Sequence, residues 1–309
     1  MPELLCMGEP MLELNAQPPG PDGRVLYLEG HGGDTSNAAI CAARQGASVG
    51  YVTALGQDRP GDSFMRLWAA EGVDTATVLR HPEAPTGLYL VTHDARGHAF
   101  TFYRGNSAAS RYAVGDVPEA AIRAARILHV SGISQAISAS ACDAVFHAIA
   151  VARAAGVRVS YDTNLRLSLW PPARAAAVIH AAIARADFAL PSLDDARALT
   201  GLEQPEAIAE FYLRLGCPIV LLKQGKDGVL VATAEGGRSL IPPHRVRAVD
   251  ATGAGDAFAG AFLARVLAGD EPIAAARYAN ACAALSTTGY GAVAPLPRPE
   301  AVRALMEQA

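Results

Sequence analysis

The stretch that decides the fold is Val249–Asp270, which reads VDATGAGDAFAGAFLARVLAGD. Two glycines, Gly253 and Gly255, precede a run with apolar residues at helical spacing, and this run contains no proline and ends at Gly269. Glycine has no Cβ, so the backbone here can bend tightly and approach a ligand closely. The spacing therefore predicts a helix that begins at the glycines and carries Asp256 in its first turn.

A helix begins with backbone N–H groups that have no partner inside the helix, and its dipole is positive at that end. Residues 253–256 are therefore predicted to bind an anion, and a phosphate would suit the site. One interpretation of Asp256 is helix stabilisation, worth ~0.3–1 kcal/mol for a carboxylate in the first turn. The other is a general base that takes a proton from an alcohol attacking a phosphoryl group. A carboxylate repels a phosphate, so a purely structural protein would gain little from placing Asp256 beside this anion-binding glycine loop.

Strand-like and helix-like segments alternate over most of the chain. The strand-like runs are short, rich in Val, Ile and Leu, and nearly continuous in apolar character, as expected for strands buried on both faces. They cover residues 3–9, 49–55, 126–132, 157–162, 187–192, 218–225 and 228–233. Helical patterns cover residues 36–47, with Ser36 as the candidate N-cap, and 61–72, 138–156, 193–201 and 205–216. The alternation predicts an α/β fold with a largely parallel central sheet.

Two stretches, about residues 12–30 and 86–104, do not fit this alternation. The first is rich in Pro and Gly; the second, TGLYLVTHDARGHAFTFYR, predicts a hairpin that turns at DARG, Asp94–Gly97. An antiparallel hairpin in a parallel α/β chain must lie outside the main sheet. We expect both stretches to form a small β-lid over the ligand-binding edge, the alternative being a surface flap without a role.

The composition limits the classes of function. The 309 residues are 51% hydrophobic and 18% charged, which suits one large domain with a sizeable core. A net charge of −4 favours neither a nucleic-acid nor a membrane partner. The five cysteines show no CxxC spacing, so we expect buried, reduced thiols. No signal peptide and no apolar run of ~18 residues is visible, so we expect a cytoplasmic location. GxxxxGK[ST], GxGxxG after the first strand, GxSxG and HExxH are also absent.

Two motifs, GGDTSNAAICAARQG near the start and DATGAGDAFAGAFL near the end, resemble those of the ribokinase-like carbohydrate kinases, in the same order and at a similar separation. The resemblance spans essentially the whole chain. It implies one domain over residues 1–309, with a three-layer α/β/α fold, a largely parallel central sheet and a small β-sheet lid. Further stretches, among them FYRGNSAAS and DTNLRLSLW, resemble the branch of the family that phosphorylates 2-keto-3-deoxygluconate.

The resemblance implies roles for individual residues. The anion hole would consist of Gly253, Ala254 and Gly255, with Asp256 as catalytic base. The position of Ala251 usually holds Thr or Pro in the family, so we expect a mild change in the properties of the anion hole there.

The sugar would contact Gly33, Asp34, Asn37, Tyr89 and Tyr103, and the substrate carboxylate would be held by Arg104 and Arg166.

Each of these roles has a plainer alternative. Asp34 and Asn37 could cap the helix that follows them, and both arginines could be ordinary surface residues. Phe102 stands where relatives carry a Tyr, which leaves the exact sugar open. His31 and His129 are expected to be structural, because no nucleophile or second ligand is near them.

For the nucleotide, LLKQGKDGVLV resembles the strand–turn–strand at the ATP site of the family. Lys223 would supply positive charge to a phosphate, Gly225 and Gly228 would allow close approach, and Asn280 would line the adenine pocket. A tight turn with an exposed Lys is the plainer alternative. Ser192 would contact the nucleotide. Ser192 and Asp195 replace the Asn and Glu that many members carry in a stretch linked to Mg²⁺ and phosphate, and both could act through water, so we assign no protein ligand to a metal. Mg²⁺ is expected as its ATP complex.

The predicted activity is ATP-dependent phosphorylation of the terminal hydroxyl of 2-keto-3-deoxygluconate, with water excluded by the lid. The alternatives are a relative acting on fructose, another deoxy-keto acid or a nucleoside, and a sugar or nucleotide sensor that has lost turnover. The predicted partners are a sugar acid and ATP, together with further copies of the chain joined through the lid. A requirement for a monovalent cation is left open.

Overall fold

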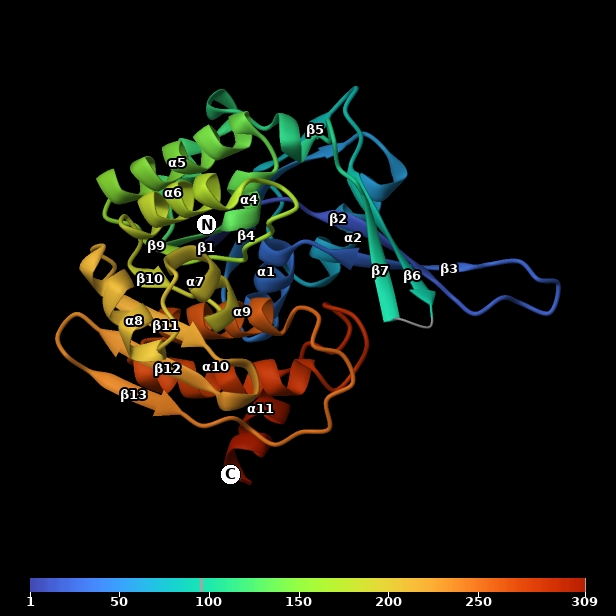
Figure 1. Cartoon of the computed structure of the whole chain (residues 1–309). Coiled ribbons are helices and arrows are strands. Elements are labelled where there is room, and N and C mark those ends of the chain that lie inside the picture. Colours follow the sequence, from blue (N-terminus) through green and yellow to red (C-terminus); the bar gives the residue numbers. More distant parts are fainter. Residues whose placement is uncertain (95–96, 309) are drawn as a thin grey trace.

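The computed structural model describes residues 1–94 and 97–308. Within these residues the main sheet has nine strands, and Figure 1 shows helices packed on both of its faces. The strands β1, β4, β5 and β8 to β11 are parallel to one another, whereas β12 runs antiparallel to β11 and β13. In order across the sheet, the strands are β13 (Arg238–Ile241), β12 (Val229–Thr233), β11 (Ile219–Lys223), β10 (Phe188–Ala189), β9 (Arg158–Asp162), β8 (Ile127–Ser131), β1 (Leu4–Met7), β4 (Val49–Gly56) and β5 (Val78–His81).

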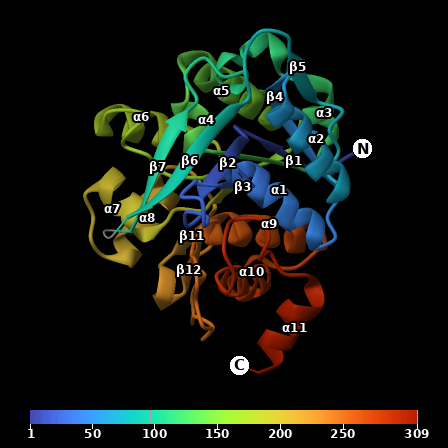
Figure 2. The same ribbon diagram turned by 90° about the vertical axis from the view of Figure 1, so that its right-hand side faces the viewer.

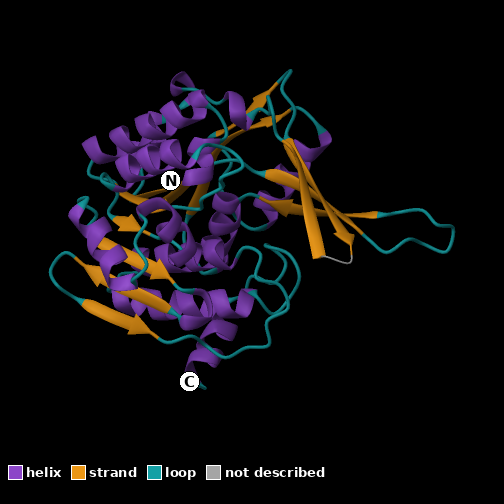
Figure 3. Ribbon diagram, viewed as in Figure 1, coloured by secondary structure: helices purple, strands orange, loops and turns teal. Residues whose placement is uncertain are grey.

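The apolar strands have both faces covered because each face packs against its own layer of helices. In β1, Leu4 and Cys6 belong to one buried cluster and Leu5 and Met7 to the other. The layers stand out in Figure 3 as helices on either side of the strands. One layer contains α3 (Glu119–Ala124), α4 (Gly132–Ala136), α5 (Ala139–Ala154), α6 (Pro172–Ile183), α7 (Leu193–Thr200) and α8 (Pro205–Arg214), and the other contains α1 (Asp34–Arg44), α2 (Arg59–Ala70), α9 (Ala254–Leu267), α10 (Pro272–Ser286) and α11 (Pro299–Glu307).

The predicted three-layer α/β/α architecture is therefore confirmed, and each of the seven strand-like runs contains a strand of the main sheet. The edge strands β5 and β13 were not predicted. Both are four residues long and partly exposed, so their sequences lack the continuous apolar run that marks a central strand. All five cysteines are free and buried, as expected.

The helix starts follow local capping chemistry, with one correction. Ser138 caps α5, since its side chain accepts a hydrogen bond from the Ala141 N–H. The predicted N-cap of α1, Ser36, is wrong: α1 begins after Gly33, whose φ of 112° favours glycine. The Ser36 hydroxyl lies inside the helix instead and accepts a hydrogen bond from the indole N–H of Trp68 at 2.9 Å.

A second, smaller sheet forms the β-lid, which stands beside the main body in Figure 1 and faces the viewer in Figure 2. Its described strands run in the order β3 (Tyr27–Gly32), β2 (Met11–Ala16), β6 (Gly87–Asp94) and β7 (Gly97–Tyr103). The strands β6 and β7 are the predicted hairpin, paired antiparallel from Leu88 with Tyr103 to Asp94 with Gly97. Of the predicted DARG turn, Ala95 and Arg96 lie outside the described residues. That residues 1–309 form a single domain stays a prediction.

Among residues 1–94 and 97–308, none of the helices combines the length and the apolar character that a membrane span needs.

The lid has an exposed apolar edge. β3 is its outermost strand on one side, and a row of apolar side chains leads into and along it: Val25, Leu26, Tyr27 and Leu28, which are 50%, 64%, 46% and 63% exposed. An edge strand with apolar side chains is a template for pairing with another chain. That copies of the chain associate through the lid stays a prediction, and the edge at β3 is the surface through which they would pair.

Replacing Leu28 by Glu is expected to convert an oligomer into a monomer, because the charge would be buried on association. Light scattering after size exclusion measures this as a fall in molar mass to that of the single 32.0 kDa chain. Leu240→Glu is the matched control: Leu240 is also 63% exposed, on the edge strand β13 of the main sheet, and its replacement should leave the mass unchanged. A wild-type protein of 32.0 kDa in solution would contradict the prediction.

Candidate active site

The candidate site lies where the parallel strands of the main sheet end. In open α/β sheets, ligands bind beyond the carboxyl ends of the strands, near the point where the strand order reverses. Here the order reverses at β1, because β4 and β5 lie on one side of it and β8 to β13 on the other. Glu9 follows β1, Asp162 ends β9 and Lys223 ends β11. The N-termini of α1 and α9 and the lid complete the site.

The glycine loop forms the predicted start of α9. Gly253 is the N-cap with φ 76°, a left-handed conformation, and a Cβ there would lie 2.8 Å from the Cβ of Ala292. The Ala254 N–H donates to the carbonyl of Ala251. Within the described residues, the N–H groups of Gly255 and Asp256 have no acceptor. These two amides at the positive end of the helix dipole suit an anion.

Asp256 is joined to α1 by a hydrogen bond. The Asn37 side-chain amide donates a hydrogen bond to Oδ2 of Asp256 at 2.8 Å. This contact depends on the close packing of α1 on α9: a Cβ at Gly260 would lie only 2.3 Å from the carbonyl oxygen of Ala38. Oδ1 of Asn37 is buried and has no hydrogen-bond partner in the described part of the chain. That oxygen can therefore accept a hydrogen bond from a ligand hydroxyl.

Further carboxylates surround Asp256. Asp34 accepts from its neighbour, the Thr35 N–H, and from the Asn164 side chain at 2.9 Å. Burial raises the pKa of Asp256 to about 7, and the negative charge of Asp34 adds to the rise. The Asn37 hydrogen bond lowers the same pKa by stabilising the carboxylate. A carboxyl group that titrates near neutral pH suits general-base chemistry.

Lys223 supplies positive charge beside the glycine loop. Its Nζ donates to Oδ2 of Asp162 at 2.6 Å and lies 3.3 Å from the position a Cβ would take at Gly255. Burial raises the pKa of Asp162, and the charge of Lys223 opposes that rise. The predicted Lys is thus next to the predicted anion hole, paired with a carboxylate that the sequence analysis did not identify.

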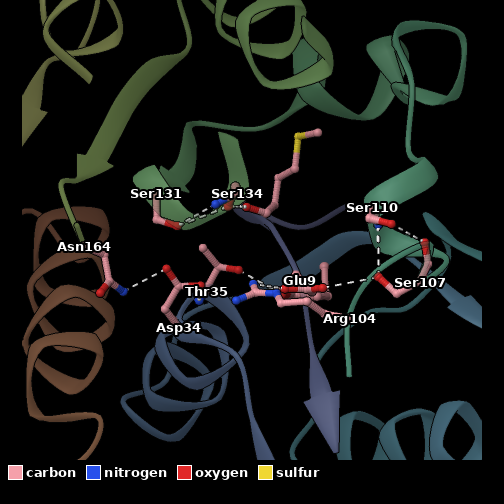
Figure 4. Close-up of polar contacts among 11 residues, drawn as sticks. Glu9, Asp34, Thr35, Arg104, Ser107, Ser110, Ser131, Ser134 and Asn164 are labelled. Carbon is pink, nitrogen blue, oxygen red and sulfur yellow. Dashed lines mark hydrogen bonds and ion pairs between the residues drawn. The ribbon is translucent and has the colours of Figure 1, made fainter. Parts of the chain in front are cut away.

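At the other side of the site, Arg104 leaves the lid and pairs with Glu9. Figure 4 shows these two side chains between Asp34 and Ser107. An Nη2–H of Arg104 donates to Oε2 of Glu9, and the Ser107 hydroxyl donates to Oε1 of Glu9 at 3.3 Å. Burial raises the pKa of Glu9, against the effect of the Arg104 charge. Arg166 is exposed, and its guanidinium donates to the carbonyl of Leu165.

The strand register divides the lid residues between two faces. Tyr89 pairs with Phe102 and lies on the face toward Gly32, the last residue of β3 before α1: a Cβ at Gly32 would lie 2.5 Å from the Tyr89 hydroxyl, which donates to Glu13. Tyr103 pairs with Leu88, one position along, so its side chain lies on the opposite face and is 58% exposed. The structure thus brings Tyr89 to the site and leaves Tyr103 on the outer face.

The predicted nucleotide residues have local structural roles. Ser192 is the N-cap of α7, where its Oγ accepts from the Asp195 N–H. The turn between β11 and β12 contains Gly225 and Gly228, both with positive φ, and a Cβ at Gly228 would lie 2.0 Å from the carbonyl oxygen of Ile241. Asn280 of α10 donates to the carbonyl of Pro242 at 2.8 Å.

Sequence reasoning missed Glu9, Asp162 and Asn164. The available signal was positional: each is a polar residue at the end of a buried strand or two positions beyond it, at the edge where parallel strands end together. The two histidines expected to be structural, His31 and His129, both have side-chain hydrogen-bond partners. His129 is buried and hydrogen-bonded to Ser160, and burial lowers its pKa to about 4. His31 contacts Ser63 at 2.9 Å. No group of three or more His, Cys, Asp or Glu in residues 1–94 and 97–308 is arranged to hold a metal ion.

The chain is similar to carbohydrate kinases in sequence and to solved kinase structures in fold. Residues 1–299 match the model of the pfkB family of carbohydrate kinases. The chain is 35% identical to a 2-dehydro-3-deoxygluconokinase of Thermoproteus tenax, over 99% of the chain and 95% of that protein. It is 33% identical to fructokinase-1 of Oryza sativa subsp. japonica, over 92% of the chain and 90% of that protein. A crystal structure of a putative ribokinase II from E. coli, in complex with ATP and Mg²⁺, superposes with a TM-score of 0.91 at 26% identity, covering 100% of both chains.

Replacing Asp256 by Asn is expected to stabilise the protein at high pH. Because the pKa of Asp256 is above its unfolded value in the folded state, its contribution to stability falls as the pH rises from about 4 to about 7. The variant's advantage in free energy of unfolding should therefore grow over this interval and then level off. Urea unfolding at pH 4 to 8 measures it.

Glu235→Gln, at an exposed position in the turn after β12, controls for the loss of one negative charge. An Asp256→Asn variant whose advantage does not change with pH would contradict the raised pKa.

Proposed function

We propose, from the premise that the chain belongs to the pfkB family of carbohydrate kinases, that it phosphorylates the terminal hydroxyl of 2-keto-3-deoxygluconate (2-dehydro-3-deoxygluconate) with ATP. The chain is a carbohydrate kinase; the identity of the sugar and the roles of the residues are the proposal. The observation that carries it is Asp256, a carboxyl group with a pKa near 7 at the amide end of α9, hydrogen-bonded to Asn37.

In the proposed reaction, Asp256 accepts the proton of the terminal hydroxyl as that oxygen bonds to the γ-phosphorus. The bond from this phosphorus to the oxygen it shares with the β-phosphate breaks, and ADP leaves with the electron pair. The catalytic demand of phosphoryl transfer is positioning and charge stabilisation, with little covalent chemistry. The amides of Gly255 and Asp256 would donate to the transferred group, and the neighbouring Lys223 would offset its negative charge.

ATP would lie over the ends of β10 and β11, on the side of Lys223. Gly225 and Gly228 would allow the nucleotide to approach the backbone, and Asn280 and Ser192 would line its pocket. Mg²⁺, when bound, neutralises phosphate charge and is held mainly by the nucleotide and water, as this ion prefers.

The sugar would lie between α1 and the lid. Gly33, Asp34 and Asn37 are at the start of α1, where backbone and side chains can reach hydroxyl groups. Tyr89 would cover the sugar from the lid. Arg104 and Arg166 would hold the carboxylate, since guanidinium groups match carboxylate geometry.

Tyr103 lies on the outer face of the lid and would not contact the sugar, contrary to the role expected for it. Phe102 is on the inner face, next to Tyr89 at a ring-centroid distance of 5.7 Å, and would supply an apolar wall.

Fructose is the second candidate. Similarity to the rice fructokinase-1 is nearly as high as to the 2-dehydro-3-deoxygluconokinase, 33% against 35%. The buried Glu9 also compensates the positive charge of Arg104, and a neutral sugar could bind beside this ion pair without bringing a negative charge of its own.

Asp256→Asn is expected to lower kcat by roughly 10²–10⁴-fold, the usual contribution of a positioned base. Sugar and ATP should still bind, because the amide keeps the shape of the carboxyl group. ADP release measures turnover, and calorimetry measures binding. A variant that keeps more than a tenth of the wild-type kcat would rule out Asp256 as the base.

The substrate is tested by ADP release with 2-keto-3-deoxygluconate, 2-keto-3-deoxygalactonate, fructose, ribose and adenosine. We expect the highest kcat/KM for the first. Arg166→Gln should raise KM for this acid about tenfold to a hundredfold, the range for a charge-assisted hydrogen bond, and leave any activity on fructose unchanged.

Arg185→Gln is the control, because Arg185 is exposed and precedes β10 at the opposite edge of the sheet. Preference for fructose in the wild type, together with an Arg166→Gln variant of unchanged KM, would reject the keto-acid assignment.

A further inference from the structure

Glu9 is a fully buried carboxylate that the proposed reaction does not use. It follows β1, at the reversal point of the strand order, and its side chain is 0% exposed. A buried carboxylate is costly unless it is paired and hydrogen-bonded. Glu9 has both kinds of partner, the Arg104 guanidinium and the Ser107 hydroxyl. Its position is close to the substrate motif, because a Cβ at Gly33 would lie 2.5 Å from the Glu9 carbonyl oxygen.

The guanidinium of Arg104 is oriented by two contacts. One Nη2–H is engaged by Glu9, and the guanidinium carbon lies 5.7 Å from the centroid of the Phe102 ring. The side chain is 14% exposed. Its Nε–H is buried and has no hydrogen-bond partner among the residues that the structure describes. A buried donor left without a partner is unfavourable, and an oxygen atom of a ligand would relieve that cost.

The segment that follows Arg104 also contacts Glu9, through the hydroxyl of Ser107. Ser107 is held in turn by Ser110, whose N–H donates to the Ser107 hydroxyl oxygen at 3.3 Å and whose hydroxyl donates to the Ser107 carbonyl at 2.8 Å. Figure 4 shows this chain of contacts running from Glu9 to Ser110. Glu9 thus connects the end of the lid strand β7 to the end of β1.

We propose that Glu9 is a positioning residue for substrate binding: it holds Arg104 by one Nη2–H so that the Nε–H is presented to an oxygen of the sugar. Glu9 itself does not touch the substrate. The inference rests on the proposed function only in taking Arg104 as a sugar ligand; it holds for a carboxylate oxygen and for a hydroxyl oxygen alike.

A double-mutant cycle tests this. The variants are Glu9→Gln, Arg104→Gln and the double variant, and the measurements are KM and kcat for the sugar that the wild type prefers, with the sugar Kd from calorimetry without ATP. Glu9→Gln should raise KM and Kd about tenfold and change kcat less than twofold. In the Arg104→Gln background, the same substitution should raise them no further, because Glu9 acts only through Arg104.

Glu71→Gln is the matched control for the loss of a buried ion pair. Glu71 bonds Arg44 at 2.7 Å, both side chains are 12% exposed, and the pair joins the far ends of α1 and α2. This variant should lower the free energy of unfolding without changing KM. Glu9→Gln can also lower stability, but only the proposed role raises KM and removes that rise in the Arg104→Gln background.

The inference is overturned if Glu9→Gln leaves KM and Kd unchanged, or if its effect on them is the same in both backgrounds. A failure of the keto-acid assignment is recognised separately, from the wild type alone. A wild type that prefers fructose contradicts the substrate proposal, and the cycle is then measured with fructose, where coupling between Glu9 and Arg104 still decides the role of Glu9.

Discussion

The site depends on the close approach of two helices. At Gly260 the backbone of α9 meets the backbone of α1 so tightly that even a methyl group would collide with the Ala38 carbonyl. The two helix N-termini can therefore place Asn37 in hydrogen-bond contact with Asp256, residues 219 positions apart in the chain. A larger residue at position 260 would separate the helices and break this contact. The packing constraint is thus also a constraint on the chemistry.

The second constraint is electrostatic. The negative charges of Asp34 and Asp162 both act on Asp256, and within the described residues Lys223 is the positive group that contacts this cluster, through Asp162. Burial raises the pKa of Asp256, and repulsion from the negative charge of Asp34 raises it further. A general base needs a raised pKa, whereas a phosphate needs positive surroundings. The backbone amides at the start of α9 provide positive surroundings for a phosphate in addition to Lys223. A raised pKa at Asp256 and a site for an anion can therefore lie within one helical turn.

The sequence predicted the central strands, the lid hairpin and the start of α9, because each has a local signature: continuous apolar runs, a polar turn and a glycine pair before a helical run. It could not predict the pairing of Arg104 with Glu9 or of Lys223 with Asp162, since these contacts join residues 95 and 61 positions apart. Nor could it place Tyr103: Tyr89 and Tyr103 both lie in the hairpin, but the face of each is set by the register of β6 with β7.

Two buried polar atoms without a partner among residues 1–94 and 97–308 set opposite requirements for the ligand. Oδ1 of Asn37 is a buried acceptor and needs a donor, while Nε of Arg104 is a buried donor and needs an acceptor. A purely anionic ligand satisfies Arg104 but not Asn37, and an apolar ligand satisfies neither. A hydroxyl group donates and accepts, so a polyhydroxylated molecule can satisfy both atoms. An acid sugar adds a carboxylate at one end and keeps a free hydroxyl at the other, so it can meet the guanidinium while its terminal hydroxyl approaches Asp256.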